Sequence, residues 1–217
     1  MALTIGSGIT FGSGISLNPP AGPIIGQAYG GGYYAGQISL TGDGVATHYL
    51  IVAPKATGET TRVAQIPYNV YPGANSRFNG LTNTNTLATG NHPAAKFCLD
   101  LDTGGYTDWY LPATDEYNIA YYNLKPSTTS NVTNKGYNSY SVPQRLSNFT
   151  AGTPAQTSAT LFQTGGAEAF TASDYWTSDF SPGNGSAYAF NFGTGLWDNS
   201  NSEFNTFYVR AFRRIAI

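Results

Sequence analysis

Short apolar runs alternate with polar loops in the last part of the chain. Apolar and aromatic residues gather at 175–178, 187–193 and 208–214, and each run has the length of a β-strand bounded by turn residues. The loop at 195–207 is rich in Asn, Asp, Ser and aromatic residues. Because such a loop offers hydrogen bonds and rings but little catalytic equipment, this pattern favours binding over turnover.

Two further strands are predicted near the start of the chain, in a β-rich region at roughly 24–71. Residues 30–38 and 48–53 have the composition of strands, and the Thr-Gly-Asp-Gly sequence at 41–44 between them is a turn signal. We therefore expect an antiparallel hairpin. The glycines at 30–32 are followed neither by Gly-Lys-Ser/Thr nor by a helix pattern, which argues against a phosphate-binding loop.

Two short helices are predicted in the middle of the chain. The first covers 91–99, where Asn and Pro stand at the start and apolar residues recur at helical spacing. The second begins with Thr114 as its N-cap and ends before Pro126. Its first turn contains Asp115 and Glu116, where the helix dipole favours acids, so we interpret both as helix-start residues and not as a catalytic pair.

The same spacing predicts which side chains of these helices are buried. On the second helix, Ile119, Tyr122 and Leu124 are expected to face the core. On the first, Cys98 is expected to be a buried small hydrophobic residue, because no acid or base partner is evident near it. It is the single cysteine of the chain, which excludes an internal disulfide.

The remaining segments suggest an N-terminal arm and a long insertion. Residues 3–17 carry an imperfect repeat of apolar residues separated by Gly and Ser, followed by a Pro-rich stretch at 18–23. This repeat cannot bury itself, so we predict that 1–23 is an extended arm and linker packing on a neighbouring subunit, ahead of one domain at 24–217. A disordered leader is the alternative. Residues 127–169 are polar and turn-rich, and form a candidate second recognition surface.

Composition limits the partners. Charged residues make up 10% of the chain and the net charge is −2, so neither nucleic acid nor an anionic membrane surface is expected. The many Gly, Tyr, Asn, Ser and Thr residues are typical of β-rich extracellular adhesins, and Tyr and Asn are common in binding loops. His48 and His92 stand apart from any zinc-ligand spacing, and no secretory signal or transmembrane span is evident.

The order of several motifs resembles a known family. The motifs lie at 105–113 (Gly-Tyr-Thr-Asp-Trp-Tyr-Leu-Pro-Ala), 175–178 (Tyr-Trp-Thr-Ser), 192–193 (Phe-Gly) and 209–214 (Val-Arg-Ala-Phe-Arg-Arg). Together they resemble the C-type-lectin-like domain of bacterial and phage surface proteins. The resemblance implies an α+β fold that is β-rich, with two short helices and long loops. Residues 25–36 and 49–54 look like virion proteins of marine cyanobacterial tailed phages.

The resemblance implies roles for individual residues. Trp109, Trp176, Phe192 and Arg210 would form the scaffold, with internal acceptors for both indole N–H groups and with Arg210 tying strand ends. In that family, the loop before the Val-Arg motif binds the ligand. The ligand-binding residues implied here are Asn184, Asn191, Leu196, Trp197, Asp198, Asn199, Asn201 and Glu203. An exposed Trp197 would suit a sugar ring or a protein loop. A polar hairpin loop without a ligand is the alternative.

The loop at 195–207 also contains candidate ligands for a calcium ion. The Trp-Asp-Asn triplet at 197–199 is similar to the Trp-Asn-Asp of calcium-dependent lectins, and Asp198, Asn199 and Glu203 are candidate oxygen ligands. However, acid and amide are exchanged, and neither Glu-Pro-Asn nor Gln-Pro-Asp occurs in the chain. We therefore predict no metal site and no cofactor, with calcium as the alternative.

The function implied is that of a phage virion protein. We expect the tip domain of a tail fibre or related appendage, which binds a host cell-surface glycan or protein. We also expect a homo-oligomer, with a trimer favoured, that contacts other virion subunits through residues 1–20. The alternative is a structural decoration or adaptor protein of the virion without receptor binding. An enzyme is disfavoured, because the oxidases of this fold class need a cysteine pair and a glycosidase needs two juxtaposed carboxylates.

Overall fold

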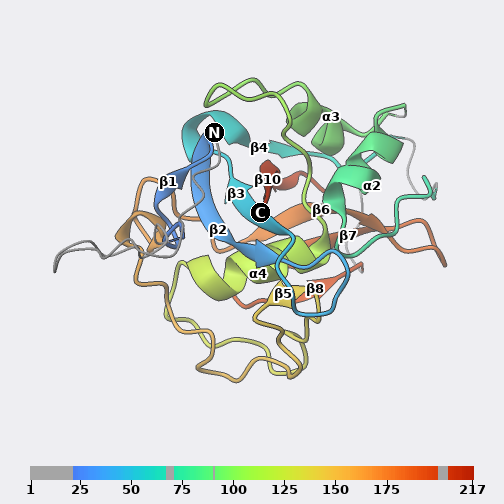
Figure 1. Cartoon of the computed structure of the whole chain (residues 1–217). Coiled ribbons are helices and arrows are strands. Elements are labelled where there is room, and N and C mark those ends of the chain that lie inside the picture. The colour runs from blue at the N-terminus through green and yellow to red at the C-terminus, as the bar shows by residue number, and fades with distance from the viewer. Residues whose placement is uncertain (1–21, 67–70, 90, 200–204) are drawn as a thin grey trace, which may run out of the picture.

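The structure, a computed structural model, describes residues 22–66, 71–89, 91–199 and 205–217. Within these ranges it is a β-rich α+β fold with two curled five-stranded sheets and few, short helices (Figure 1). The predicted α+β class is confirmed. The expectation of two short helices is wrong, because the described residues form four α-helices and one 3-10 helix.

The first sheet contains the hairpin predicted near the start of the chain. Its strand order is β1-β2-β3-β10, and β5 also pairs with β2. Tyr34 lies opposite Ile51 and Ile38 opposite His48, in antiparallel register. The strands of this sheet are β1 (Ala28–Tyr29), β2 (Gly32–Ile38), β3 (His48–Val52), β5 (Ser141–Val142) and β10 (Phe212–Ala216).

The second sheet contains most of the strands predicted in the last part of the chain. Its order is β4-β9-β6-β7-β8. All pairs are antiparallel except β6 and β9, which run parallel with Tyr175 opposite Tyr208. The strands are β4 (Glu59–Arg62), β6 (Asp174–Phe180), β7 (Ala187–Asn191), β8 (Trp197–Asp198) and β9 (Phe207–Arg210).

The chain passes from one sheet to the other at Ala211. β9 ends at Arg210 in the second sheet, and β10 begins at Phe212 in the first. Between them, the Ala211 amide donates to the Gly58 carbonyl at 3.0 Å, and the Ala211 carbonyl accepts from the Ala53 amide at 2.9 Å. These bonds fix the two sheets to each other at the crossing.

The helices flank the two sheets. The longest, α4, lies across the first sheet. Most of the loops of 127–169 gather on its far side, and the part at 158–161 lies beside residues 24–27 (Figure 1). α2 contacts β6 and α3, and α3 contacts β4. Both predicted helices are present, as α3 and α4, whereas α1 and α2 were not predicted. The bounds are α1 (Lys55–Gly58), α2 (Gly80–Leu87), α3 (Pro93–Leu99), α4 (Thr114–Leu124) and the 3-10 helix η1 (Thr160–Phe162).

A glycine lets α4 approach β2 closely. Gly36 sits at an irregularity of the β2–β3 register with a φ of 137°. A Cβ at this position would lie 2.5 Å from Asn123 Nδ2 and 2.8 Å from Ile119 Cγ2 on the helix. The space left by the missing side chain allows Asn123 Nδ2 to donate to the Ala35 carbonyl at 2.8 Å.

Glu116 organises the start of α4. Its Oε2 accepts from the amides of Ala113, at 2.9 Å, and Gly80, at 3.0 Å, so one buried acid supports the first turns of α4 and α2 together. The prediction of Glu116 as a helix-start acid is confirmed. The N-cap is Ala113 and not Thr114, because the Thr114 amide and hydroxyl both bond the carboxylate of buried Asp179.

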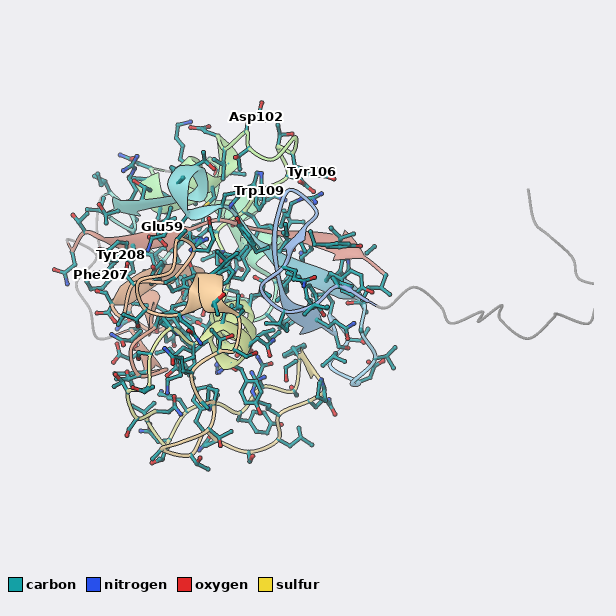
Figure 2. The ribbon with its side chains drawn as sticks, turned by 90° about the vertical axis from the view of Figure 1, so that its left-hand side faces the viewer. Glu59, Asp102, Tyr106, Trp109, Phe207 and Tyr208 are labelled. Carbon is teal, nitrogen blue, oxygen red and sulfur yellow. The ribbon has the colours of Figure 1, made fainter. Side chains whose placement is uncertain are left out.

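The predicted scaffold aromatics are buried and satisfied. Trp109 Nε1 donates to the Tyr106 carbonyl at 2.9 Å, and the two residues lie near each other in Figure 2. Trp176 Nε1 donates to the Arg62 carbonyl at 2.9 Å. Phe192 is fully buried. Both indoles therefore have the internal acceptors that were expected.

Arg210 ties the strand ends together from inside the core, as predicted. It is fully buried, and its Nε donates to the Ala53 carbonyl at 3.0 Å. Its Nη1 donates to the Glu168 carbonyl at 2.8 Å, and its Nη2 donates to Glu168 Oε2 at 2.5 Å. Glu59 completes the ion cluster at 3.6 Å and lies near Tyr208 of the neighbouring strand (Figure 2). The guanidinium is thus matched by acceptors on several segments.

The segment 127–169 has little regular structure but is held to the fold by Lys125. This lysine is 2% exposed. Its Nζ donates to the Thr129 carbonyl at 2.5 Å, to Asn131 Oδ1 at 2.7 Å and to the Pro154 carbonyl at 3.2 Å. Tyr121 on α4 donates to the same Asn131 oxygen at 2.6 Å. One ammonium group therefore joins Thr129 and Asn131, early in the segment, to Pro154 later in it.

Of the predicted core positions, Cys98, Ile119 and Leu124 are buried as expected. The prediction for Tyr122 is wrong, since this residue is 37% exposed. Its ring packs on Phe149 and under the Arg145 guanidinium, on the outer side of α4, so an aromatic residue is stabilised there without facing the core.

The predicted arm at 1–23 falls almost entirely outside the described residues, which begin at Gly22. Its packing on a neighbouring subunit stays a prediction.

Candidate binding surface around Trp197

A tight turn positions the predicted binding loop. Asn191, the last residue of β7, accepts at its Oδ1 from the amides of Gly193, at 2.9 Å, and Thr194, at 3.0 Å. Its Nδ2 donates to Asp174 Oδ1 at 2.9 Å. Gly195 follows with a φ of 74°, a conformation that favours glycine. The chain thereby returns as β8 against β7, and the polar atoms of Asn191 serve the turn itself.

Trp197 on β8 is half-buried, in contrast to the exposed ring that we expected. The guanidinium carbon of Arg77 lies 4.0 Å from its ring centroid, and Lys135 Nζ lies 3.7 Å from it. The ring of Tyr188 meets it edge-on at 5.9 Å between centroids. Two cations and one ring thus hold the indole in a fixed orientation at the rim of the molecule.

The cations around this ring influence each other. Burial lowers the pKa of Lys135, the charge of Arg77 lowers it further, and the charge of Asp198 opposes both effects. Two like charges near one ring repel each other, and the π-face of Trp197 offsets part of that repulsion. The ring of Trp197 and the carboxylate of Asp198 therefore stabilise the positive charges at this position.

The structure brings the predicted Asn184 and Asn199 together. Asn199 Nδ2 donates to Asn184 Oδ1 at 3.4 Å, and the Ser186 amide donates to the same oxygen at 3.1 Å. Leu196 and Asp198 lie on either side of Trp197 and are half-buried. Of the remaining predicted residues, Asn201 and Glu203 lie outside the described residues.

A cavity of about 620 Å³ opens beside this surface, on the other side of Arg77. Arg77 Nη2 donates to Asp115 Oδ1 at 3.1 Å, so the arginine contacts Trp197 and the cavity at once. Phe78 and Tyr140 stack with ring centroids 3.9 Å apart. The lining residues are Asn75, Ser76, Arg77, Phe78, Asp115, Tyr137, Asn138, Ser139 and Tyr140.

Asp115 gives this cavity a titratable group. Burial raises the pKa of its carboxyl group to about 7; the Arg77 guanidinium acts in the opposite direction, and the Asp179 carboxylate adds to the rise. Asp115 stands in the first turn of α4, as predicted. Its position in a cavity wall was missed, because the neighbouring residues come from distant parts of the chain.

Arg77, Phe78, Lys135, Tyr137 and Tyr140 were also missed as individual site residues. The last three belong to the segment 127–169, which the sequence marked as a possible second recognition surface. The Tyr-Asn-Ser-Tyr sequence at 137–140 is the available signal, because this composition is typical of binding loops. The structure merges this segment with the predicted loop into one surface, which we call the Trp197 surface: Arg77, Lys135, Trp197, Asn199 and the adjoining cavity.

Two other groups with possible chemistry are committed to the fold. Burial raises the pKa of the Cys98 thiol, so the thiolate that a nucleophile requires is disfavoured. Burial likewise raises the pKa of Asp179, whose oxygens accept from the amide and hydroxyl of Thr114 at 2.8 and 2.7 Å. Both groups act as structural residues.

The described ranges contain no group of three or more His, Cys, Asp or Glu residues placed to hold a metal ion. Asp198 and Asn199 are described, but the third candidate calcium ligand, Glu203, is not. The expectation about calcium therefore stays a prediction. None of the helices within the described ranges has the length and apolar composition that a membrane span requires.

Neither the models of protein families nor the curated proteins contain a match to this chain. The assignment of a function therefore depends on the geometry of the Trp197 surface and on the motifs in the sequence.

Proposed function

We propose that this chain is a C-type-lectin-like recognition domain at the tip of a phage tail fibre or related appendage. It binds a glycan or protein on the host cell surface through the Trp197 surface. The observation that carries the proposal is the half-buried Trp197, with Arg77 and Lys135 both within 4.0 Å of its ring centroid, next to a cavity. The role is binding, and no catalytic step is part of it.

The geometry of the ring supports a binding role. Fixing an aromatic side chain before the ligand arrives lowers the entropy that binding costs, and aromatic residues with nearby arginines often dominate binding energy. Arg77 and Lys135 hold Trp197 in this way. The two contacts stabilise the loop and also place positively charged N–H donors beside the ring.

Scaffold features support the fold part of the proposal. Trp109, Trp176 and Arg210 occupy buried, fully bonded positions, as the resemblance to C-type-lectin-like domains implies. The binding loop precedes the strand that ends in Arg210, which is also its place in that family. The virion location follows from the same resemblance and is part of the proposal.

The test is binding of the labelled full chain to candidate host cells, beginning with marine cyanobacteria. A Trp197→Ala, Asn199→Ala double variant is measured beside it. Tyr106→Ala serves as the control, because Tyr106 is 39% exposed in the turn at 103–106 and does not line the cavity beside Trp197. Folding of each is checked by circular dichroism. Saturable binding that the double variant loses and the control keeps supports the proposal. Equal binding by all three removes the Trp197 surface from the function.

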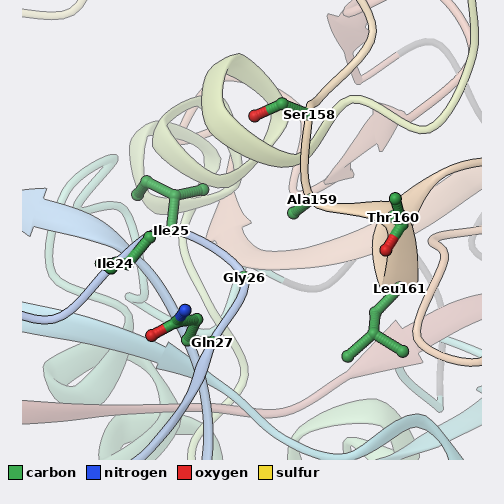
Figure 3. Close-up of a pocket in the computed structure, with 8 residues that line it drawn as sticks. All are labelled: Ile24, Ile25, Gly26, Gln27, Ser158, Ala159, Thr160 and Leu161. Carbon is green, nitrogen blue, oxygen red and sulfur yellow. The ribbon is translucent and has the colours of Figure 1, made fainter.

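A second function, assembly within the particle, is favoured by the surface where the described chain begins. Residues 24–27 face residues 158–161 across a cavity of about 320 Å³ (Figure 3). Ile24 is 59% exposed and Leu161 45% exposed. A neighbouring cavity of about 440 Å³ is lined by residues of 22–29 and Tyr49. Exposed apolar residues around two cavities are typical of a protein interface.

The occupant that we propose for this surface is residues 3–17 of a second copy. Their apolar residues are separated by Gly and Ser, which allows a close approach to a partner. Light scattering of the full chain is expected to give an oligomer, with a trimer favoured, and a monomer after deletion of 1–17 or in Leu161→Glu. Leu146→Glu is the control, because Leu146 is 63% exposed in a different segment. A monomeric full chain contradicts this second function.

A further inference from the structure

We propose that the cavity beside Trp197 is a subsite for a neutral, hydroxyl-rich sugar residue. The inference rests on the proposed function, and narrows its ligand from any surface receptor to a carbohydrate. The volume of about 620 Å³ falls within the range of roughly 300–1,000 Å³ that small-molecule sites occupy. The cavity has both apolar and polar walls, as the binding of a sugar requires.

Aromatic rings form the apolar walls. Phe78 and Tyr140 stack within 10° of parallel, although one precedes α2 and the other belongs to the segment 127–169. Tyr137 is 54% exposed and lines the same cavity. An exposed ring beside a stacked pair offers flat apolar surface to the C–H face of a sugar ring, and the tyrosine hydroxyls add hydrogen bonds at the edges.

A buried ion pair forms the polar wall. The side chain of Asp115 is 9% exposed, and the side chain of Arg77 is 41% exposed. Arg77 uses one N–H on Asp115, and its Nε is buried, so the donors that remain for a ligand are the other Nη hydrogens of this 41% exposed side chain. A guanidinium carries five N–H donors, so Arg77 retains donors for a ligand. A pair of adjacent hydroxyl groups can donate to Asp115 and accept from Arg77.

The backbone holds this ion pair in place. The Asp115 amide donates to the Arg77 carbonyl at 2.7 Å, and Asn138 Nδ2 donates to the Asp115 carbonyl at 2.8 Å. Asn138 is itself 1% exposed and accepts from the Tyr140 amide at 2.9 Å. The polar wall and the aromatic wall are therefore joined by hydrogen bonds, so the site is formed before a ligand arrives.

The charges around the cavity favour a neutral ligand. Asp115 on the wall disfavours an anionic group, and Arg77 and Lys135 nearby disfavour a cationic one. Arg145, Glu116 and Asp179 also act on Asp115, with Arg145 opposing the two acids. Neither sign of charge dominates. Hydroxyl groups, which donate and accept without a net charge, match this mixed environment best.

Arg77 connects the cavity to Trp197, because it contacts both. We therefore expect one sugar residue in the cavity and the next at the Arg77 and Lys135 groups that lie over Trp197, so that the ligand is an oligosaccharide. Loss of the Tyr137 side chain is then expected to weaken binding of the sugar in the cavity alone. Loss of the Trp197 side chain is expected to weaken binding of the neighbouring sugar.

The experiment measures binding of the labelled full chain to an array of defined neutral, sialylated and uronate-containing oligosaccharides. Tyr137→Ala is the main variant, because removal of an exposed ring leaves folding intact, and Asp115→Asn is the second. Tyr106→Ala is the matched control, because Tyr106 is also an exposed tyrosine but lines neither this cavity nor the two cavities near residues 22–29. We expect binding to neutral oligosaccharides, lowered at least about tenfold by Tyr137→Ala and unchanged by Tyr106→Ala.

The outcomes separate this inference from the proposed function. If the chain binds cells but no neutral oligosaccharide on the array, or binds acidic ones alone, the sugar subsite is wrong and the receptor function stands. The same conclusion follows if Tyr137→Ala binds as well as the unaltered chain. A protein ligand would appear as cell binding that survives periodate treatment of the cells and is lost after protease treatment. Absence of binding to both cells and array overturns both proposals.

Discussion

Two kinds of cation stand in contrast in this molecule. Arg210 and Lys125 lie inside the fold, whereas Arg77 and Lys135 lie at its rim around Trp197. Arg210 is fully buried and donates to two backbone carbonyls and to one carboxylate on other segments. Arg77 donates to one carboxylate, stacks on an indole, and keeps a buried Nε without a hydrogen-bond partner in the described part of the chain.

The two lysines repeat the contrast. Lys125 Nζ has three oxygen acceptors within 3.2 Å, whereas Lys135 Nζ lies over the ring of Trp197. A buried charged group is stable only when its donors have hydrogen-bond acceptors, so the donors of Arg210 and Lys125 are used within the fold. A cation held by a ring retains donors. The difference indicates which positive charges maintain the structure and which are available to a ligand.

The largest expected effect is that of Arg210→Met. This change removes the guanidinium and leaves buried Glu168 without its cation, whereas Glu59 keeps Lys55 at 3.4 Å. Breaking a buried ion pair in this way costs about 3–5 kcal/mol of the free energy of unfolding. Urea denaturation followed by tryptophan fluorescence measures the loss.

The comparison variant for Arg210→Met is Arg77→Met. The side chain of Arg77 is 41% exposed, and its cation–π contact is worth about 0–1 kcal/mol. Its buried partner Asp115 has a pKa raised to about 7, so it can take up a proton when the cation is removed. A smaller loss of stability than for Arg210→Met is therefore expected. Equal losses in the two variants would mean that Arg77 is as structural as Arg210, and the distinction between inner and rim cations would be wrong.

A smaller effect is expected for Lys125→Met. The carbonyl groups of Thr129 and Pro154 and the amide oxygen of Asn131 lose a shared charged donor, although Asn131 keeps Tyr121 and Pro154 keeps Asn131 Nδ2. Hydrogen bonds to a charged group contribute about 1.5–3 kcal/mol, so a loss in that range is expected. Because the lysine closes the loops of 127–156, amide hydrogen exchange there should accelerate more than in β2 and β3. Lys135→Met is the control and is expected to leave exchange in these loops unchanged. Uniform acceleration throughout the chain would show that Lys125 stabilises the whole fold and does not act locally.

The fold could be predicted where local pattern and tertiary structure agree. The hairpin of β2 and β3, helices α3 and α4, and most of the C-terminal strands have clear apolar periodicity or caps. Helix α2 has a cap residue, Asn79, but no apolar periodicity, since its sequence is Gly-Leu-Thr-Asn-Thr-Asn-Thr-Leu. It is stabilised by the Asn79 cap and by the bond from Thr84 Oγ1 to the Leu111 carbonyl at 3.1 Å. A tertiary partner of this kind has no signal in the helix's own residues.

The candidate site divides in the same way. Trp197 and Asn199 lie in a loop that the sequence marks by its composition and by its place before the Val-Arg motif. Arg77 and Tyr137 belong to separate segments, and the fold alone brings them to the same surface. The spacing of residues along the sequence does not predict that Arg77 and Tyr137 lie on the same surface. The sequence therefore indicates one side of the surface, and the structure adds the cavity.

The smallest expected effect concerns Asp115, the acid of the rim. Burial raises the pKa of its carboxyl group from 3.8 to about 7. Between these values the folded chain holds a proton that the unfolded chain has released, so stability decreases as pH rises through this window and is level above it. Asp115→Asn lacks this titration. From pH 6 to pH 8 the variant should gain about 1 kcal/mol in stability relative to the unaltered chain.

Urea denaturation of both chains at several pH values measures this difference. Glu116 and Asp179, whose pKa values are also raised by burial, remain in both chains, so their contributions largely cancel in the comparison. Parallel stability curves would place the pKa of Asp115 near its ordinary value, which requires the Arg77 ion pair to outweigh burial. Arg77 would then be held as firmly by its acid as Arg210 is, and fewer of its donors would be available to a ligand.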